Sequence, residues 1–454
     1  MPSVGSPVLP RERISKVKVT IHRGAHTIGG SCVEISTSES RLIIDLGMPL
    51  MAKGGGGIDS AALDRPSIEN GILPALDGVY NFQEADTRVE GVLLSHAHID
   101  HYGLLAWVHP AIPVFMNRET RALLEVGNVF YKPSIRQHAV LDHCRTFTHW
   151  RAFEIGPFTI TSYLMDHSAF GASSLLIEAG GKRIFYSGDL RAHGRKRKVF
   201  ERLLDAPPAN IDCLLLEGTT LGGKHHVGFD TEDDVERAMT EHFRSASDAC
   251  FVVSAGSNID RLVSIYKAAL RSDRTLVLDL YQLHMLEQLK NFSTGLPPHD
   301  TEHVRAFFIH QHCQLLEDAR GKKSVYKWRS HRIEMDDILA RRRELVLRLP
   351  ISWMSRIAKR MLKSGSLDQA GYIYSMWPGY AERQPEFAQL SADLGVPMTT
   401  IHTSGHAYEA DLVRFAKALA PKALIPVHTL SGDEFGKYFQ NVVRVGDGAC
   451  YEVR

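Results

Sequence analysis

Cysteine is scarce in this chain, and its placement excludes two common ways of building a stable site. The six cysteines among 454 residues are scattered and form no Cys-x-x-Cys pair. We therefore expect neither a disulfide framework nor a zinc site made of thiolates. The same pattern favours a reducing compartment.

Long apolar runs and an excess of one charge are also missing. No stretch approaches the ~18 apolar residues of a membrane helix, and the first sixteen residues contain no apolar core of a secretory signal. The formal net charge is +1, so any affinity for nucleic acid must come from a local patch. We therefore expect a cytoplasmic protein without a membrane partner, and the 44% hydrophobic content supports a globular core.

The order of the expected elements indicates one domain interrupted by another. Short β-rich runs separated by glycine turns fill the first half, with a first helix expected over Gly103–His109. Strands and helices then alternate, as in the strand Cys250–Ser254 and the helix Asn258–Arg271, before β-rich character returns. The expected parts are a β-rich domain over 1–222 and 398–454, and an inserted α/β domain over 223–397.

The densest group of candidate metal ligands is His96-Ala97-His98-Ile99-Asp100-His101, directly after an apolar strand at Gly91–Ser95. The two histidines two residues apart can face one metal ion, and Asp100 and His101 on the following turn can hold a second. Imidazole and carboxylate ligands without cysteine suit zinc and leave room for water, which favours a catalytic site. A chance cluster of loop histidines explains the fixed four-position pattern poorly.

Three further residues, His167, Asp189 and Asp45, each follow an expected strand. Alone, each is compatible with an ordinary loop or turn residue. Two metal ions need about seven ligands, so His167 and Asp189 become candidates once the first motif is in place. Asp45 is better interpreted as a carboxylate that orients a ligand histidine than as a turn cap.

Together these residues resemble the metallo-β-lactamase superfamily and, within it, the β-CASP nucleases. The first four superfamily motifs are matched in order by Asp45, His96-x-His98-x-Asp100-His101, His167 and Asp189. The three β-CASP motifs are matched by Glu217, His406 and His428. The pattern is most similar to that of RNase J-like enzymes, in a short form without their C-terminal domain. The resemblance implies an αββα sandwich with an inserted α/β cap domain.

The resemblance also implies two Zn²⁺ ions, with Mn²⁺ as an alternative, and a division of roles. The first ion would be held by His96, His98 and His167, the second by Asp100, His101 and His428, and both by Asp189. The pair would activate water and stabilise charge on phosphorus, with Asp45, Asp100 and Asp189 as catalytic carboxylates. His406 would protonate the leaving 3′-oxygen and Glu217 would orient it, although His406 and His428 alone could be ordinary polar histidines.

The resemblance further implies a substrate. Histidine at the third β-CASP position, here His428, is typical of RNA-acting members, so single-stranded RNA is favoured and DNA stays open. A pocket for a 5′-monophosphate is suggested at Ser257, His402, Ser404 and Gly405. Such a pocket implies 5′-to-3′ exonuclease action, with endonuclease cleavage also open. The alternative is that Ser257-Asn258 caps the following helix, which is compatible with the pocket.

Basic residues gather in two places. Residues 320–363 contain fourteen lysines and arginines against four acidic residues, with Tyr326, Trp328 and Trp353 between them. This pattern suits a surface that follows an RNA backbone and stacks its bases, although a solvated helix face or a partner interface fits nearly as well. Arg191–Arg202 is a second basic run, which we expect to line the same channel.

Three functions stay open at this point: a ribonuclease, another metallo-hydrolase of the same fold such as a DNA nuclease, and an inactive nucleic-acid-binding paralogue. Glu217, His406 and His428 argue against small ester substrates, because enzymes for such substrates lack the cap. The complete ligand set argues against the inactive paralogue. A homodimer is compatible with the pattern.

Overall fold

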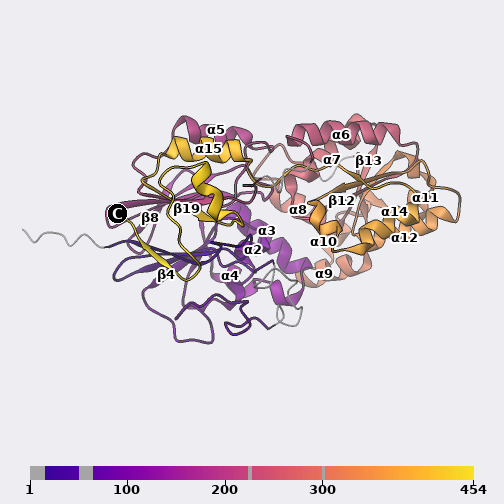
Figure 1. The fold of residues 1–454 in the computed structure, drawn as a ribbon. Helices are drawn as coiled ribbons and strands as arrows, with labels where there is room; N and C mark the ends of the chain where they lie inside the picture. Colours follow the sequence, from indigo (N-terminus) through magenta and orange to yellow (C-terminus); the bar gives the residue numbers. More distant parts are fainter. Residues whose placement is uncertain (1–15, 51–64, 223–227, 299–301) are drawn as a thin grey trace, which may run out of the picture.

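The structure, a computed structural model, describes residues 16–50, 65–222, 228–298 and 302–454 (Figure 1). Residues 1–15 of the N-terminal segment lie outside the described residues. The expected domain boundary at 222/223 falls at the edge of the undescribed residues 223–227. Within the described part of the chain, no helix is both long and apolar enough to cross a membrane.

Two mixed β-sheets pack face to face around a shared hydrophobic core. The first sheet has the order β20-β1-β2-β3-β4-β5-β6 and the second has the order β19-β11-β10-β9-β8-β7. The strands of the first are β1 (Lys18–Arg23), β2 (Cys32–Ser36), β3 (Arg41–Ile44), β4 (Val89–Leu93), β5 (Val114–Asn117), β6 (Arg145–Phe147) and β20 (Cys450–Glu452). Those of the second are β7 (Ala152–Ile155), β8 (Phe158–Leu164), β9 (Ser173–Ala179), β10 (Lys182–Tyr186), β11 (Cys213–Glu217) and β19 (Ala423–Val427).

The apolar residues of these strands explain why the two sheets face each other. In β3, Leu42 and Ile44 belong to the core shared with the second sheet, whereas Ile43 belongs to the core on the opposite face. Successive side chains of a strand point to opposite faces, so a strand that is apolar throughout must be covered on both. The second sheet is likewise buried on both faces, by the shared core and by a separate cluster against helices.

Helices cover the two outer faces. On the first sheet lie α2 (Ile99–Tyr102), α3 (Arg118–Phe130) and α4 (His138–His143), and on the second lie α5 (Arg197–Asp205) and α15 (Glu409–Leu419). In α5 and α15, Phe200 and Phe415 stack with their ring centroids 6.0 Å apart over the second sheet. The layers therefore run helix, sheet, sheet, helix.

A third sheet lies entirely between β11 and β19 in sequence, although these two strands pair in parallel in the second sheet. All its strands are parallel, in the order β15-β14-β13-β16-β12-β17-β18. They are β12 (Cys250–Ser254), β13 (Thr275–Asp279), β14 (Val304–Phe307), β15 (Arg332–Ile333), β16 (Leu345–Arg348), β17 (Gly371–Ser375) and β18 (Thr399–Thr400).

Helices bury both faces of the third sheet. One face packs against α6 (Glu232–Ser245), α7 (Ile259–Arg271), α8 (Leu280–Leu289) and α9 (His310–Arg320). The other packs against α11 (Met335–Ala340), α12 (Ile351–Leu362) and α14 (Pro385–Leu394). The predicted αββα sandwich with an inserted α/β segment is confirmed, and Figure 1 shows the insertion beside the sandwich. We propose that the insertion is a domain of its own, with the boundaries given above.

Two helix predictions had different outcomes. The helix expected from Asn258 is confirmed: α7 begins at Ile259, and the Asn258 side chain accepts a hydrogen bond from the Arg261 amide. The helix expected over Gly103–His109 is wrong, because the chain forms the short α2 inside the histidine motif and then a single 3₁₀ turn at Leu105–Trp107. The apolar run after Gly103 is buried without continuing the helix.

Buried charges join the insertion to the sandwich. Arg191, which precedes α5, and Arg261, in the first turn of α7, have no exposed surface. Arg191 donates hydrogen bonds to Asp260 Oδ2 (2.5 Å) and to Glu232 Oε1 (3.4 Å), and Arg261 donates to Glu232 Oε1 (2.8 Å). Glu232 and Asp260 stand in the first turns of α6 and α7, where the helix dipole also favours a carboxylate.

The same charges hold the loops that carry candidate site residues. Arg191 donates to the Ser404 carbonyl (2.9 Å), and Lys196 donates to the His167 carbonyl (3.0 Å) and to Asp260 (2.8 Å). Arg195 is neutralised by Glu236. The prediction that Arg191–Arg202 lines a substrate channel is therefore wrong for these three residues, because carboxylates of the insertion occupy their charged groups.

Glu232→Gln tests this network, because it leaves the guanidinium groups of Arg191 and Arg261 buried without their shared carboxylate. Breaking a buried ion pair on one side costs about 3–5 kcal/mol. We expect the free energy of unfolding in urea to fall by that amount. The adjacent Asp233→Asn removes a carboxylate that is 45% exposed and should cost less than about 1 kcal/mol. Equal losses in the two variants would contradict the network.

Candidate metal centre

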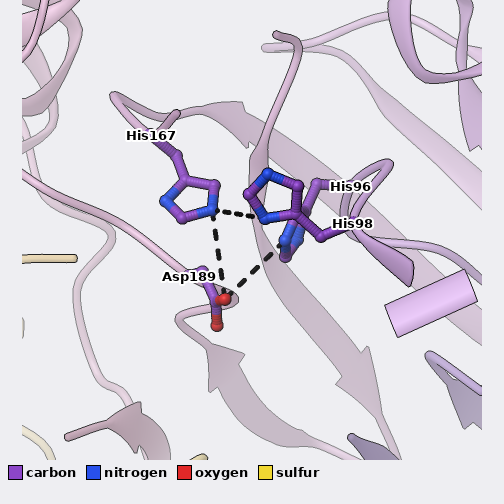
Figure 2. A group of neighbouring side chains, drawn as sticks. All are labelled: His96, His98, His167 and Asp189. Atoms are coloured by element: carbon purple, nitrogen blue, oxygen red, sulfur yellow. Dashed lines mark hydrogen bonds and ion pairs between the residues drawn. The ribbon is translucent and has the colours of Figure 1, made fainter. Parts of the chain in front are cut away.

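The candidate ligands follow the carboxyl ends of four strands. The motif His96–His101 follows β4, His167 follows β8, Asp189 follows β10, and His428 comes directly after β19. Because β4 lies in the first sheet and the other strands lie in the second, the two sheets bring the residues together from both sides. Figure 2 shows His96, His98, His167 and Asp189 pointing toward one another.

The ligand atoms form three overlapping groups, and within each group all atoms lie within 4.8 Å of one another; the third group is Asp189, His406 and His428. The first ligand set is His96, His98, His167 and Asp189, and the second ligand set is Asp100, His101 and His428. Asp189 Oδ2 lies 3.7 Å from His96 Nε2, 3.1 Å from His101 Nε2 and 3.7 Å from His428 Nε2. The carboxylate of Asp189 therefore stands between the two sets.

The burial of these atoms fits a metal ion. His96 Nε2, His101 Nε2, His428 Nε2 and Asp189 Oδ1 are buried and have no hydrogen-bond partner. Leaving one buried polar atom unpaired costs about 1–3 kcal/mol, and here several such atoms converge. Nitrogen and oxygen donors without cysteine suit zinc. Cations at the two ligand sets would satisfy these atoms.

The pKa values of the histidines in the two ligand sets also favour metal binding. Burial lowers the pKa of His98 to about 4, and it lowers the pKa values of His96 and His167 well below their usual range. These three imidazoles are therefore neutral, which is the form that binds metals. For His101, burial opposes protonation, yet the carboxylates of Asp189 and Asp45 raise its pKa well above the ordinary value. The second ligand set thus lies in a strongly negative environment that attracts a cation.

Asp45 is held in one orientation behind the second ligand set. Its carboxylate accepts hydrogen bonds from the Ser95 amide (2.7 Å), the Ser95 hydroxyl (2.7 Å), His101 Nδ1 (2.8 Å) and the Tyr186 hydroxyl (2.9 Å). The bond to Nδ1 leaves His101 Nε2 directed at Asp189. Asp45 adopts a positive φ of 57°, a conformation that aspartate tolerates better than most residues.

Ser31 supports His428 much as Asp45 supports His101, and the sequence did not predict this role. Its hydroxyl lies 2.8 Å from His428 Nδ1, and its amide donates to the Asp100 carbonyl at 3.0 Å. Ser31 therefore contacts two of the three residues of the second ligand set. Nothing in the sequence marks it, because 397 positions separate it from His428. Tyr186 was also missed, although its place at the end of the strand before Asp189 is a usable signal.

His406 and Glu217 form a pair beside the ligand sets. His406 Nδ1 lies 3.0 Å from Glu217 Oε2, and Glu217 also accepts from the Leu190 amide and the Thr219 hydroxyl. Burial opposes protonation of His406, but the carboxylates of Glu217 and Asp189 raise its pKa to about 9. The imidazole therefore carries a proton at neutral pH. Its ring also stacks on His428 at a centroid distance of 5.6 Å.

The residues suggested for a phosphate pocket have other contacts. His402 Nδ1 accepts a hydrogen bond from Arg261 (3.1 Å), and burial together with Arg261 lowers the His402 pKa to about 3. His402 is thus neutral and offers no charge to a phosphate. The Ser404 hydroxyl accepts from the His406 amide, and the Gly405 carbonyl contacts His167 Nδ1 at 2.6 Å. Ser257 lies at the start of α7 but does not cap it, because the cap is Asn258.

The basic stretch 320–363 is only partly a surface. Trp328 is 2% exposed and belongs to the core of the insertion, so the prediction that it stacks on bases is wrong. Arg348 is buried and donates to the Ser254 carbonyl, and Arg342 pairs with Asp248. Tyr326 is 61% exposed. Figure 1 shows α11 and α12 of this stretch at the end of the insertion that points away from the sandwich.

Comparisons with known families agree with this geometry. Residues 76–244 match the β-lactamase superfamily domain, and residues 396–439 match the RNA specificity domain of zinc-dependent metallo-hydrolases. These two matches make the chain similar to metallo-hydrolases of the β-lactamase superfamily, and each covers less than half of it. The second match covers the segment with Ser404, His406 and His428, and the first covers the other ligands.

Several ribonucleases are similar to this chain. Ribonuclease J of Corynebacterium glutamicum is 21% identical over 93% of this chain and 55% of its own length. Ribonuclease J of Mycolicibacterium smegmatis is 21% identical over 91% of this chain and 68% of its own length. An RNase J-like protein of Methanocaldococcus jannaschii is 26% identical over 45% of this chain and 42% of its own length. The chain thus spans about half the length of the first of these relatives.

The fold is also found in a crystal structure. A protein of unknown function from Enterococcus faecalis superposes with a TM-score of 0.76. The superposition covers 96% of this chain and 100% of that one, at 20% sequence identity. This likeness shows that the sandwich and the insertion occur together in another protein.

Ser31→Ala tests how the second ligand set is oriented. Without the hydroxyl, the His428 ring loses the contact that directs its Nε2 toward Asp100 and Asp189. Removing such a supporting group weakens metal affinity about 10–100-fold. We expect metal analysis in a zinc buffer to show reduced occupancy. Ser40→Ala, which removes a buried hydroxyl bonded to Glu90 instead, should leave occupancy unchanged. Full zinc affinity in Ser31→Ala would refute the assignment.

Proposed function

We propose that the protein is a metal-dependent ribonuclease that hydrolyses phosphodiester bonds of single-stranded RNA. The observation that carries this proposal is the Asp189 carboxylate between two ligand sets, with the His406–Glu217 pair beside it. The match to an RNA specificity domain and the likeness to ribonuclease J enzymes support RNA over other substrates. A complete set of buried ligands argues against an inactive paralogue.

The proposed cofactor is a pair of zinc ions, with manganese as the alternative. Bound at the two ligand sets, they would activate water and neutralise charge that develops on the phosphate. The residues of the chain determine the geometry. Asp189 joins the two sets, and Asp45 holds His101 through Nδ1 so that Nε2 faces the centre. Ser31 acts on His428 in the same way.

His406 is the proposed general acid. Glu217 keeps a proton on Nδ1 and stabilises the imidazolium, which leaves the Nε2 proton for the 3′-oxygen that departs from phosphorus. The side chain of His406 is 21% exposed, whereas that of Glu217 is 1% exposed. Glu217 is therefore a positioning residue, and His406 is the member of the pair that reaches the substrate.

We further propose 5′-to-3′ exonuclease action on 5′-monophosphorylated RNA, with endonuclease cleavage as a second activity. The support is the place of Ser257 at the start of α7, where helix amides favour an anion. Ser404 and Gly405 follow His402 on the loop that Arg261 of the same helix binds. His402 takes part as a neutral side chain held by Arg261. A homodimer is retained as the proposed assembly.

Asp189→Asn should abolish cleavage, because a neutral amide replaces the carboxylate that lies between the two ligand sets. We expect wild-type protein to degrade 5′-end-labelled single-stranded RNA, a chelator to stop it, and zinc or manganese to restore it. The variant should lose at least ~10³-fold in rate, whereas Asp205→Asn on the exposed end of α5 should be unaffected. Cleavage that persists in a metal-free preparation, or action on DNA alone, would refute the proposal.

A separate experiment tests the proposed preference for RNA with a 5′-monophosphate. Ser257→Ala removes the hydroxyl at the start of α7 and leaves the loop of His406, which Ser404 holds, unchanged. We expect the ratio of cleavage rates for 5′-monophosphate over 5′-hydroxyl RNA to fall toward one, while cleavage of 5′-hydroxyl RNA stays within about two-fold of wild type. An unchanged ratio would show that the end of the RNA is not bound at the Ser257 hydroxyl.

A further inference from the structure

His193 is a buried histidine outside both ligand sets, and the proposed mechanism gives it no role. It is 5% exposed and lies shortly after Asp189, on the segment that leads to α5. Its Nδ1 atom is buried and has no hydrogen-bond partner among the described residues. An unpaired buried nitrogen is costly. Packing alone therefore does not explain a histidine here, because a phenyl ring would fill the same space without that cost.

The other ring nitrogen, Nε2, holds the backbone of the loop that carries His406. It lies 3.0 Å from the Ser404 carbonyl oxygen. A carbonyl oxygen only accepts hydrogen bonds, so Nε2 carries the proton and donates it. Burial, together with the charge of Arg191, lowers the pKa of His193 to about 3, so the imidazole stays neutral. The Tyr408 ring stacks on the imidazole with the centroids 4.3 Å apart and the planes inclined by 12°, which fixes the orientation of the ring.

Two donors hold the Ser404 carbonyl. Arg191 donates to it at 2.9 Å and His193 at 3.0 Å. A carbonyl oxygen has two lone pairs, and both are used here. The peptide plane between Ser404 and Gly405 therefore cannot turn without breaking a buried hydrogen bond. His193 is itself held by the insertion, because its own carbonyl accepts a hydrogen bond from the Glu232 amide (3.0 Å) at the start of α6.

The orientation of this peptide determines where His406 lies. The Ser404 hydroxyl accepts a hydrogen bond from the His406 amide at 3.0 Å. Gly405, between the two residues, is closely packed, because a Cβ at this position would lie 2.9 Å from Ser168 Oγ. The loop thus has little freedom once the Ser404 carbonyl is held. The His406 side chain then meets Glu217, with Nδ1 and Oε2 3.0 Å apart.

We propose that His193 is a positioning residue: its Nε2 hydrogen bond holds the Ser404 carbonyl and thereby directs His406 at the 3′-oxygen that leaves phosphorus. This inference rests on the proposed ribonuclease function. A general acid must lie within hydrogen-bond reach of the atom that it protonates, and a displacement of about 1 Å can slow a reaction ~100-fold. Because the Glu232 amide holds His193, the insertion contributes to catalysis through this contact as well as through its charges.

Two substitutions of His193 separate the hydrogen bond from the packing. His193→Phe keeps a ring against Tyr408 and removes the donor, whereas His193→Gln brings an amide nitrogen to the position of Nε2 and keeps the donor. We expect kcat on single-stranded RNA to fall about 10–100-fold in His193→Phe, with KM within about two-fold of wild type, and His193→Gln to retain most of the rate. Equal losses in the two variants would contradict the role of the donor.

The leaving group distinguishes a misplaced acid from a general disturbance of the site. In an RNA with sulfur in place of the 3′-oxygen at the cleaved bond, the leaving group is a thiolate. It needs no proton from His406, because a thiol is far more acidic than an alcohol. On this RNA the losses in His193→Phe and in His406→Ala should both shrink to within about two-fold of wild type. An equal loss in His193→Phe on both RNAs would overturn the inference, because His193 would then only support the fold of the site.

Hydrogen exchange tests the contact without any cleavage. The amides of His406 and Ala407 donate to the Ser404 hydroxyl and to the Leu190 carbonyl, so their exchange shows whether the loop is held. The loss of one hydrogen bond corresponds to a factor of about 2–12. We expect these amides to exchange faster by such a factor in His193→Phe but not in His193→Gln, and unchanged exchange in His193→Phe would overturn the inference. Faster exchange in a protein that cleaves no RNA would refute the ribonuclease and preserve the link from His193 to His406.

Discussion

The structure depends on one buried carboxylate. Asp189 is 1% exposed and lies within 4.0 Å of nitrogen atoms of five histidines, two of which, His101 and His428, belong to the second ligand set. A buried charge and several unpaired imidazole nitrogens are costly unless a cation joins them. The four strand ends that meet at this point are therefore best understood as a scaffold for metal ions.

The inserted segment contributes to the centre through charge. Glu232 and Asp260 at the starts of two of its helices neutralise Arg191 and Lys196, and these cations in turn hold the carbonyl groups of Ser404 and His167. Carboxylates of the insertion thus help to hold the loops beside the ligands. This coupling gives the insertion a structural role in the centre in addition to any contact with a substrate.

The sequence predicted the parts of the site that local spacing determines. The motif from His96 to His101 is readable because its ligands share one strand end, and the fold follows from the order of strands and helices around it. Ser31 could not be found, because its partner lies 397 positions away. The predictions that Arg191 lines a substrate channel and that Trp328 stacks on bases were wrong. Both side chains are buried, and the number of charged or aromatic residues in a segment does not reveal which of them are buried. Whether each ligand has its expected role stays a prediction.

Anomalous X-ray scattering from crystals grown with zinc tests the central claim most directly. Data collected on the two sides of the zinc absorption edge locate the ions without any assumption about activity. The account predicts two anomalous peaks, one at the first ligand set and one at the second, with Asp189 between them. Peaks elsewhere, or none at these residues, would contradict it.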